Sequence, residues 1–449
     1  MPNQPKETIT IIGAGLGGAL MACYFAKAGY PVEVFERRPD PRSGKIVGGR
    51  SINLALSQRG LHALREVGLA EPVLKLAIPM PGRMIHSPSG QLSYQPYDKD
   101  PDRAILSVSR GGLNQLLVET AEALPNVTVR FGQRCIDVDL DAPRATLEDI
   151  DSHELTQTTG RIIIGADGAF SAVRSRLQRE DRFDYQQQYL EHGYKELHIP
   201  AADAGGFRIE PNALHIWPRE SYMMIALPNP DGSFTCTCFW PFRGPHGFEQ
   251  LQTPEQIRAY FEKHFADAVP HMPTLVEDFQ QNPTSSLVTV RCGPWNYRDK
   301  VVLLGDAAHA VVPFYGQGMN CAFEDCTILN ECVAQHAPDW GKVFAAYYGE
   351  RKPNADALAN LALYNFIEMR DHSGSRLFRW KKSFERFVDR ITGKWYTPLY
   401  TMISFTRTPY AAAVRRAARQ DRAVFNVAIA FITLLFIIVM WLIFRTQGA

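Results

Sequence analysis

The sequence predicts an α/β fold in which a Rossmann-like dinucleotide-binding domain is interleaved with an antiparallel sheet, followed by a helical C-terminal region and one transmembrane helix. Three observations predict it. A glycine-rich turn joins a strand to a helix near the amino terminus, short alternating runs occupy the middle of the chain, and a long apolar run lies near its end. With 449 residues, 45% of them hydrophobic, the chain is long enough for two packed domains or one large interleaved one.

Charge and cysteine usage argue against two classes of function. The 48 basic and 47 acidic residues leave a formal charge of +1, so no broad positive field favours nucleic acid as a partner. The 8 cysteines form no CxxC pair and no histidine cluster accompanies them. We therefore expect buried, reduced thiols and no metal site. The first residues lack a secretory signal pattern, and we expect the body of the protein to stay where it is made.

The first predicted element is a strand, glycine turn and helix. An apolar strand over residues 8–12 leads into GAGLGG at 13–18, and a helical run follows to Ala28. The glycines let the backbone approach a pyrophosphate, and the helix amino terminus offers it free N–H groups. A second strand over residues 31–35 ends at Glu36, at the roughly 20-residue spacing of an acid that binds ribose hydroxyls.

Two later strands end in glycine and aspartate. They read IIIGADG at 162–168 and VVLLGDAAH at 301–309, and such a turn brings a carboxylate close to a polyol. Downstream, PFYGQGMN at 313–320 opens a helix whose N–H groups suit an electron-rich flavin edge. In this order the motifs resemble the single-component FAD-dependent aromatic hydroxylases. The resemblance implies bound FAD with NADPH as a transient co-substrate, and no second GxGxxG is found for a nicotinamide domain.

Further segments resemble the kynurenine 3-monooxygenase family of these hydroxylases in particular, from the first glycine turn to the end of the chain. They are GRSINLALS at 49–57, GRMIH at 82–86, LSVSR at 106–110, LYNFIEMR at 363–370 and PLYTM at 398–402. The resemblance implies hydroxylation of L-kynurenine to 3-hydroxy-L-kynurenine with O2 through a flavin hydroperoxide, a step of tryptophan degradation. No catalytic acid or base is assigned, because the aniline nitrogen of kynurenine already activates the ortho carbon.

The resemblance also implies the site residues. Arg83 and Tyr97 match the pair that holds the carboxylate of kynurenine, and a guanidinium fork suits bidentate binding of that group. Asn365 and Tyr400 match polar groups on the helical side of the pocket, with a helix-surface amide and a core aromatic as the alternatives. The FAD contacts implied are Gly13, Gly15, Leu16, Gly18, Glu36, Arg37, Ala55, Arg110, Asp167, Asp306, Gly318, Met319 and Asn320.

Hydroxylation needs a dry pocket, and four aromatic residues are candidates to line it, each of which would equally suit a core. They are Phe239, Trp240, Phe314 and Phe366. His309 directly follows the second Gly-Asp motif at a helix start, which favours a structural or cofactor-contact role over catalysis.

The remaining pattern divides the chain into an antiparallel sheet that roofs the flavin, an FAD-binding domain around it, and a helical region. The predicted boundaries are 80–97 and 186–284 for the sheet, 1–79, 98–185 and 285–340 for the FAD-binding domain, 341–422 for the helical region and 424–444 for the membrane anchor.

The anchor is predicted from an uncharged apolar run between Val424 and Phe444. At about 1.5 Å per residue it spans the roughly 30 Å hydrocarbon layer, and it lacks the polar face of a core helix. Trp441 suits an interfacial position. The arginines that precede the run outnumber the single Arg445 that follows, which places the body of the protein on the cytosolic side. They are Arg415, Arg416, Arg419 and Arg422.

Residues 408–422 are rich in alanine and arginine, and we expect them to lie along lipid headgroups. The membrane would be the mitochondrial outer membrane in a eukaryote and the inner membrane in a bacterium. A hydrophobic helix that docks on a partner protein is the alternative.

Two other functions stay open at this point. A membrane-bound flavin hydroxylase or epoxidase of a quinone precursor or isoprenoid would explain the anchor but leave Arg83 and Tyr97 without a carboxylate. A non-catalytic, FAD-loaded membrane scaffold would show no substrate-stimulated NADPH oxidation.

Overall fold

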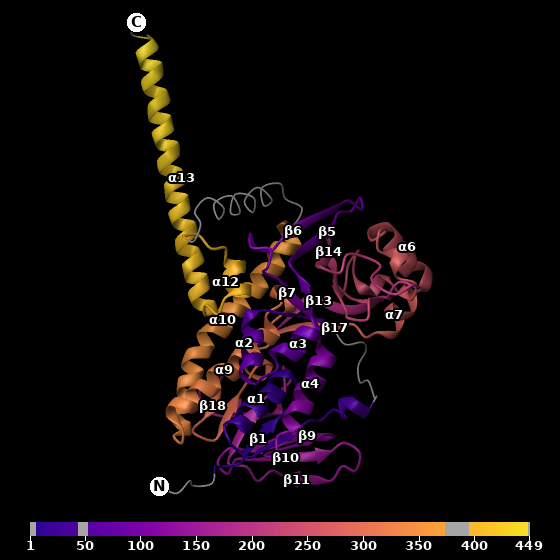
Figure 1. The fold of residues 1–449 in the computed structure, drawn as a ribbon, viewed down its shortest axis with the longest axis vertical. Helices are drawn as coiled ribbons and strands as arrows, with labels where there is room; N and C mark the ends of the chain where they lie inside the picture. Colours follow the sequence, from indigo (N-terminus) through magenta and orange to yellow (C-terminus); the bar gives the residue numbers. More distant parts are fainter. Residues whose placement is uncertain (1–5, 44–52, 373–394, 448–449) are drawn as a thin grey trace.

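The computed structural model describes residues 6–43, 53–372 and 395–447, so that GRSI at the start of segment 49–57 lies outside the described residues. One long helix, α13, rises out of a body that contains the other elements (Figure 1).

The first sheet of the body has six strands in the order β18-β19-β12-β1-β2-β8. Every neighbouring pair is parallel except β18 with β19. Its central strands are continuous apolar runs with both faces covered, as parallel strands require. The strands are β1 Ile9–Ile12, β2 Val32–Phe35, β8 Val127–Arg130, β12 Ile162–Gly165, β18 Asn296–Tyr297 and β19 Val301–Leu303.

Helices and two small sheets surround this parallel sheet, and their apolar side chains share one core with it. The helices are α1 Leu16–Lys27, α2 Gln58–Glu66, α3 Ala70–Leu76, α4 Arg110–Glu122, α5 Ala172–Leu177, α8 Asp306–His309 and α9 Gly318–His336, with 3-10 turns η1 Pro41–Ser43 and η4 Pro313–Tyr315. The small sheets are β9 Gln133–Asp139, β10 Arg144–Asp149 and β11 Leu155–Gln157, and β3 Asn53–Leu56, β4 Ile78–Met80 and β7 Ile105–Ser109.

A seven-stranded sheet in the order β17-β13-β16-β15-β14-β5-β6 forms the second layer. The strands are β5 Gly82–His86, β6 Leu92–Pro96, β13 Asp184–Ile199, β14 Ala213–Arg219, β15 Tyr222–Pro228, β16 Phe234–Pro241 and β17 Ser285–Gly293. The predicted antiparallel sheet contains one parallel pair, β14 with β5. These strands are far apart in the sequence, so no hairpin fixes their relative direction.

The two faces of the seven-stranded sheet are both covered. Alternate residues of β15 and β16 pack in one core with α6 Pro254–His264 and α7 Leu275–Gln281, beside the 3-10 turns η2 Phe248–Gln250 and η3 Val269–His271. The intervening residues of β15 and β16 point to the opposite face of the sheet. They contribute to two apolar clusters there, together with side chains from η4 and the C-terminal helices. This second face therefore looks toward the motif-bearing half of the molecule.

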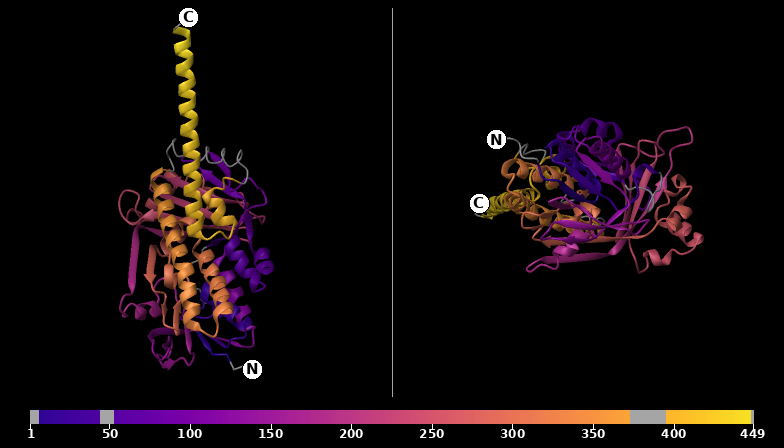
Figure 2. Two further views of the ribbon diagram at one scale, coloured as in Figure 1. Left: turned by 90° about the vertical axis from the view of Figure 1, so that its left-hand side faces the viewer. Right: turned by 90° about the horizontal axis from the view of Figure 1, so that it is seen from below.

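The C-terminal region consists of α10 Trp340–His372, α12 Leu399–Phe405 and α13 Tyr410–Gln447 in the described residues. Figure 2 shows the lower part of α13 beside α10 and its upper part projecting beyond the body. Tyr410, Ala413 and Ala417 are buried against Leu358 of α10 and other core residues, whereas the apolar side chains from Phe425 to Trp441 are exposed.

Residues 408–422, which we expect to lie along lipid headgroups, also pack against the body. Their small residues recur at helical spacing and bury one face on the protein, and Arg415, Arg416 and Arg419 point outward from the opposite face. The stretch is the packed base of α13. One described helix, within Tyr410–Trp441, is long and apolar enough to cross a membrane.

Candidate active site

The glycine turn after β1 has the geometry of a pyrophosphate cradle. Gly13 has a φ of +103°, and a Cβ on it would lie 2.5 Å from the carbonyl oxygen of Ala166. A Cβ on Gly15 would meet no atom within 4 Å, so this side of the turn faces open space. Gly15 also provides no side-chain cap for α1, which begins at Leu16. The first N–H groups of α1 are therefore placed to bind a phosphate.

Glu36 is fixed beside this turn. Its carboxylate accepts hydrogen bonds from the backbone N–H of Ala14 at 2.8 Å and of Arg38 at 2.9 Å. The neighbouring Arg37 side chain is exposed. An acid held at the end of β2 and next to the glycine turn has the position required for ribose hydroxyls.

The two Gly-Asp motifs place their carboxylates differently. Asp306 begins α8 and is open to solvent although it lies deep in the molecule, where burial raises its pKa and the charges of His309 and Arg110 oppose that rise. Asp167 instead accepts hydrogen bonds from the backbone N–H of Ala172 at 2.7 Å and from the hydroxyl of Ser171. Asp306 is therefore available to a polyol, while Asp167 holds the start of α5.

The loop before α9 is tied to β3. The side-chain amide of Asn320 donates to the carbonyl of Ala55 at 2.8 Å, and its oxygen accepts from the N–H of Ser57 at 2.9 Å. Gly316, with a φ of +66°, passes so close that a Cβ on it would lie 3.3 Å from the Cβ of Ala55. Gly318 and Met319 then open α9, which also lacks a side-chain cap. This helix start is the second one in the site that can bind an electron-rich group.

A basic and aromatic cluster forms the other half of the site. The Arg83 guanidinium of β5 lies 5.0 Å from the ring centre of Tyr97 and 4.9 Å from that of Tyr400, and the two rings stack at 5.2 Å. The buried Nε of Arg83 has no hydrogen-bond partner among the described residues. A buried donor without a partner is costly unless a ligand pairs with it. These contacts bring three of the four predicted substrate residues together.

Asn365, the fourth, extends from α10 to the loop before α9. Its amide donates to the carbonyl of Phe314 at 2.7 Å. The Phe314 ring lies 5.2 Å from that of Phe239 and 4.7 Å from that of Phe366. The three aromatic residues thus form one wall on the second face of the seven-stranded sheet, where a dry pocket was expected.

Trp240 does not belong to that wall, and its prediction as a pocket residue is wrong. It packs behind the sheet, stacked 5.7 Å from the Phe265 ring and 5.3 Å from that of Phe248. Successive side chains of a strand point to opposite faces, so Phe239 and Trp240 cannot both line the pocket.

Sequence reasoning missed several residues on the pocket side. Met223 and Ile225 of β15 pack with Phe239 and Phe314. On β13, Glu196 is half-buried, and burial raises its pKa to about 7 while the charge of Arg110 opposes the rise. The alternation of residues along β15 and β16 is the sequence signal that would have identified the apolar pair.

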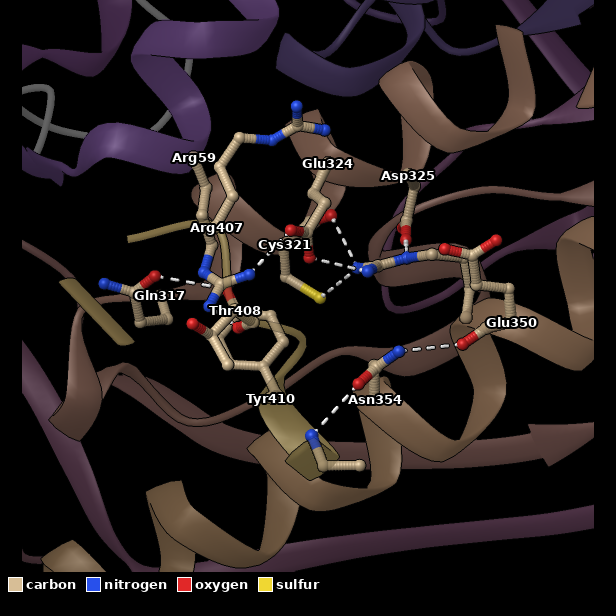
Figure 3. Close-up of polar contacts among 12 residues, drawn as sticks. Arg59, Gln317, Cys321, Glu324, Asp325, Glu350, Asn354, Arg407, Thr408 and Tyr410 are labelled. Atoms are coloured by element: carbon tan, nitrogen blue, oxygen red, sulfur yellow. Dashed lines mark hydrogen bonds and ion pairs between the residues drawn. The ribbon is translucent and has the colours of Figure 1, made fainter. Parts of the chain in front are cut away.

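A buried network of charged side chains lies between the loop before α9 and the base of α13 (Figure 3). Within it, His309 pairs with Asp325 at 2.6 Å. Burial lowers the pKa of His309, but Asp325 and Cys321 together raise it well above its ordinary value. His309, Cys321 and Asp325 lie close enough together to suggest a metal site. The Arg351 guanidinium, however, binds both Asp325 and the Cys321 sulfur, and its positive charge disfavours a cation there.

Comparison with known proteins agrees with this geometry. A family model described as an FAD binding domain matches residues 6–362. A kynurenine 3-monooxygenase of Myxococcus xanthus is 48% identical, over 94% of this chain and 90% of the relative. A kynurenine 3-monooxygenase of Dictyostelium discoideum is 46% identical, over 92% of this chain and 90% of the relative.

Solved structures with about a fifth of their residues identical show the same fold. A tetrameric form of 2-methyl-3-hydroxypyridine-5-carboxylic acid oxygenase has a TM-score of 0.65 at 20% identity and covers 82% of this chain and 94% of its own. A variant of Klebsiella pneumoniae HpxO complexed with FAD has a TM-score of 0.67 at 19% identity and covers 86% of this chain and 97% of its own.

Proposed function

The chain belongs to the FAD-dependent monooxygenases, within the kynurenine 3-monooxygenase family, and from this membership we propose that it hydroxylates L-kynurenine. The reaction consumes L-kynurenine, O2, NADPH and a proton, and yields 3-hydroxy-L-kynurenine, NADP⁺ and water. One oxygen atom enters the ring and the other leaves as water.

The proposal rests on the surroundings of the Arg83 side chain. Its guanidinium is enclosed by Tyr97 and Tyr400, and its buried Nε has no partner among the described residues. A carboxylate is the group that a guanidinium binds best, through two parallel hydrogen bonds. The amino-acid end of kynurenine supplies that carboxylate, whereas a quinone precursor or isoprenoid would leave the charge unpaired.

The residues present fit FAD. We assign the pyrophosphate to the turn from Gly13 to Gly18, the ribose to Glu36, the ribityl chain to Asp306 and the flavin edge to the start of α9 at Gly318. When bound, FAD accepts electrons from NADPH and activates O2.

The chain itself acts by holding and enclosing the substrate. Arg83 and Tyr97 would fix its carboxylate, so that the aromatic ring extends toward the loop before α9. Phe239, Phe314 and Ile225 would exclude water around that ring. The aniline nitrogen of kynurenine donates electron density to the ortho carbon, so the ring needs no basic side chain to become reactive.

The apolar part of α13 would hold this enzyme on a membrane, with the arginine-rich base and the body on the cytosolic side. Support comes from the side chains between Phe425 and Trp441, which are exposed and almost wholly apolar. A lipid bilayer is the environment in which such a surface is stable.

The test is NADPH consumption by the purified protein with and without L-kynurenine, with mass spectrometry of the product. We expect strong stimulation and a product heavier by one oxygen atom. Stimulation with peroxide alone would mean that kynurenine acts only as an effector. No stimulation would reject the proposed substrate, favouring a lipid-soluble aromatic substrate if such compounds stimulate NADPH consumption, and the non-catalytic scaffold if none does.

A further inference from the structure

The base of α13 reaches the loop that precedes α9. Tyr410, the first residue of α13, donates its hydroxyl hydrogen to the side-chain oxygen of Gln317 at 3.1 Å, and both residues are buried. Gln317 is the residue directly before Gly318, where α9 begins. The Ser57 hydroxyl lies 3.5 Å from the same Gln317 oxygen. A residue of the C-terminal helix thus contacts the turn assigned to the flavin edge.

Other bonds fix the position of Tyr410. The Arg59 guanidinium lies 4.0 Å from the centre of its ring, and the same guanidinium donates to the carbonyls of Thr408 and Ile403. Arg59 also pairs with Glu324 of α9 at 2.6 Å. In Figure 3, Arg59 and Tyr410 lie together beside Gln317. The ring therefore has a defined place, and its hydroxyl a defined direction.

The network continues from Glu324 to the second Gly-Asp motif. Arg351 binds Glu324 and Asp325, each at 2.6 Å. Asp325 in turn accepts from the N–H of Gly305 at 3.2 Å and from His309 at 2.6 Å. Gly305 directly precedes Asp306, so one chain of buried contacts joins the base of α13 to both turns that are assigned to FAD.

We propose that Tyr410 is a positioning residue of the flavin site, which orients Gln317 and thereby sets the place of the turn at Gly318 against the flavin edge. The inference rests on the proposed function. It gives the C-terminal helix a second role besides that of an anchor, since a residue at its base takes part in the geometry of the reaction.

A role limited to packing makes a different prediction. The Tyr410 ring fills a core with Met402, Ile403 and Leu358, and this packing does not depend on the hydroxyl. Among the described residues, the hydroxyl forms a hydrogen bond with Gln317 alone. Tyr410→Phe removes this bond and keeps the ring on Arg59, so it separates positioning from packing.

The experiment uses the full chain in lipid nanodiscs at saturating FAD. For Tyr410→Phe we expect the ratio of peroxide to hydroxylated product to rise about threefold to tenfold, the factor that corresponds to one neutral hydrogen bond. We also expect the visible circular dichroism of bound FAD to change. Tyr396→Phe is the matched control, because the Tyr396 hydroxyl donates to Asp421 of the same helix at 3.1 Å, away from the flavin turn.

A double-mutant cycle tests the partner. If Tyr410 acts through Gln317, then Gln317→Met alone should reproduce the effect, and the double variant should differ little from either single one. Additive effects would overturn the proposal. So would a Tyr410→Phe variant with a lower melting temperature but with the product ratio and circular dichroism of the wild type. If the wild type itself fails to respond to kynurenine, the proposed function fails, and the circular dichroism still decides the role of Tyr410.

Discussion

Arg83 is the residue on which the assignment of the substrate depends. It belongs to a strand that is otherwise an ordinary part of the seven-stranded sheet, and its charge is enclosed by two aromatic rings. The aromatic faces stabilise the cation, while its buried Nε is left without a hydrogen-bond partner among the described residues. The environment of Arg83 is therefore prepared for an anion that reaches it from the pocket.

Replacement of Arg83 by Ala is expected to lower kcat/KM for L-kynurenine by about a hundredfold or more, because two charge-assisted hydrogen bonds are lost. Steady-state NADPH oxidation at varied kynurenine concentration measures this. The control is Arg298→Ala, which removes an exposed guanidinium 4.7 Å from the Tyr297 ring, on β18. Turnover of the Arg83 variant at the wild-type level would favour a substrate without a carboxylate.

Glu196 predicts a dependence of stability on pH. Its pKa is raised from 4.5 to about 7 in the folded protein, chiefly by burial. The folded state therefore favours the protonated acid, and this contribution to stability is present below pH 4.5 and is lost as the pH rises to about 7. Glu196→Gln keeps a neutral side chain at every pH.

We therefore expect the melting temperature of Glu196→Gln, relative to wild type, to increase between pH 5 and pH 8. Thermal unfolding in a pH series measures it. Glu262→Gln, at an exposed position of α6, is the control and should show no such trend. A constant difference across the series would mean that Glu196 titrates alike in the folded and unfolded states.

At the scale of elements, β16 separates two functions within one strand. Trp240 and the cysteines of this strand face α6 and α7, while Phe239 faces the apolar cluster that contains Met223 and Phe314. Both faces are buried, so hydrophobicity alone does not distinguish them. The two faces are distinguished by the alternation of side chains along the strand.

Substitutions of Trp240 and Phe239 should affect different properties, namely stability for Trp240 and peroxide release for Phe239. Trp240→Ala should cost about 3–5 kcal/mol of unfolding free energy, because it empties a fully buried site among aromatic rings. Phe239→Leu nearly conserves volume, so stability should change by less than about 1.5 kcal/mol, while more peroxide is released per NADPH. Denaturant unfolding and peroxide assays compare them. Equal loss of stability in both variants would contradict this division.

At the scale of the whole molecule, the base of α13 packs on the body and the rest of this helix projects from it with an apolar surface. Among the described residues, its contacts with the body end near Gln420, whose amide donates to the carbonyl of Trp395 at 2.8 Å. Beyond that point its side chains are exposed, and Phe431 keeps 65% of its surface accessible. The helix thus has a packed base and a projecting part with different surroundings.

Deletion of residues 424–449 should release the protein from membranes and leave it folded, because the deleted part lies beyond the packed base. Flotation with liposomes measures the first effect. The second is measured by thermal unfolding, which should resemble that of the full chain in detergent. Membrane association of the shortened protein would place the anchor elsewhere, and loss of folding would show that the projecting part supports the body.

The sequence by itself determined the features that local chemistry sets. Gly13 and Gly18 must be glycine because a Cβ on either would lie 2.5 Å or less from a backbone carbonyl oxygen, and the run after Val424 is uncharged and almost wholly apolar as far as Phe444. The family resemblance indicated FAD and the reaction and predicted the role of Arg83, since these depend on short motifs whose order the sequence displays.

Only the tertiary structure decided what depends on contacts between distant segments. It placed Trp240 behind the sheet, paired β14 with β5 in parallel and packed the base of α13 on the body. It also joined Tyr410 to Gln317, residues 93 positions apart. Such pairings depend on how the layers pack, and no local sequence pattern encodes them. Glycine turns and apolar runs, in contrast, are determined by residues that are close together in the sequence.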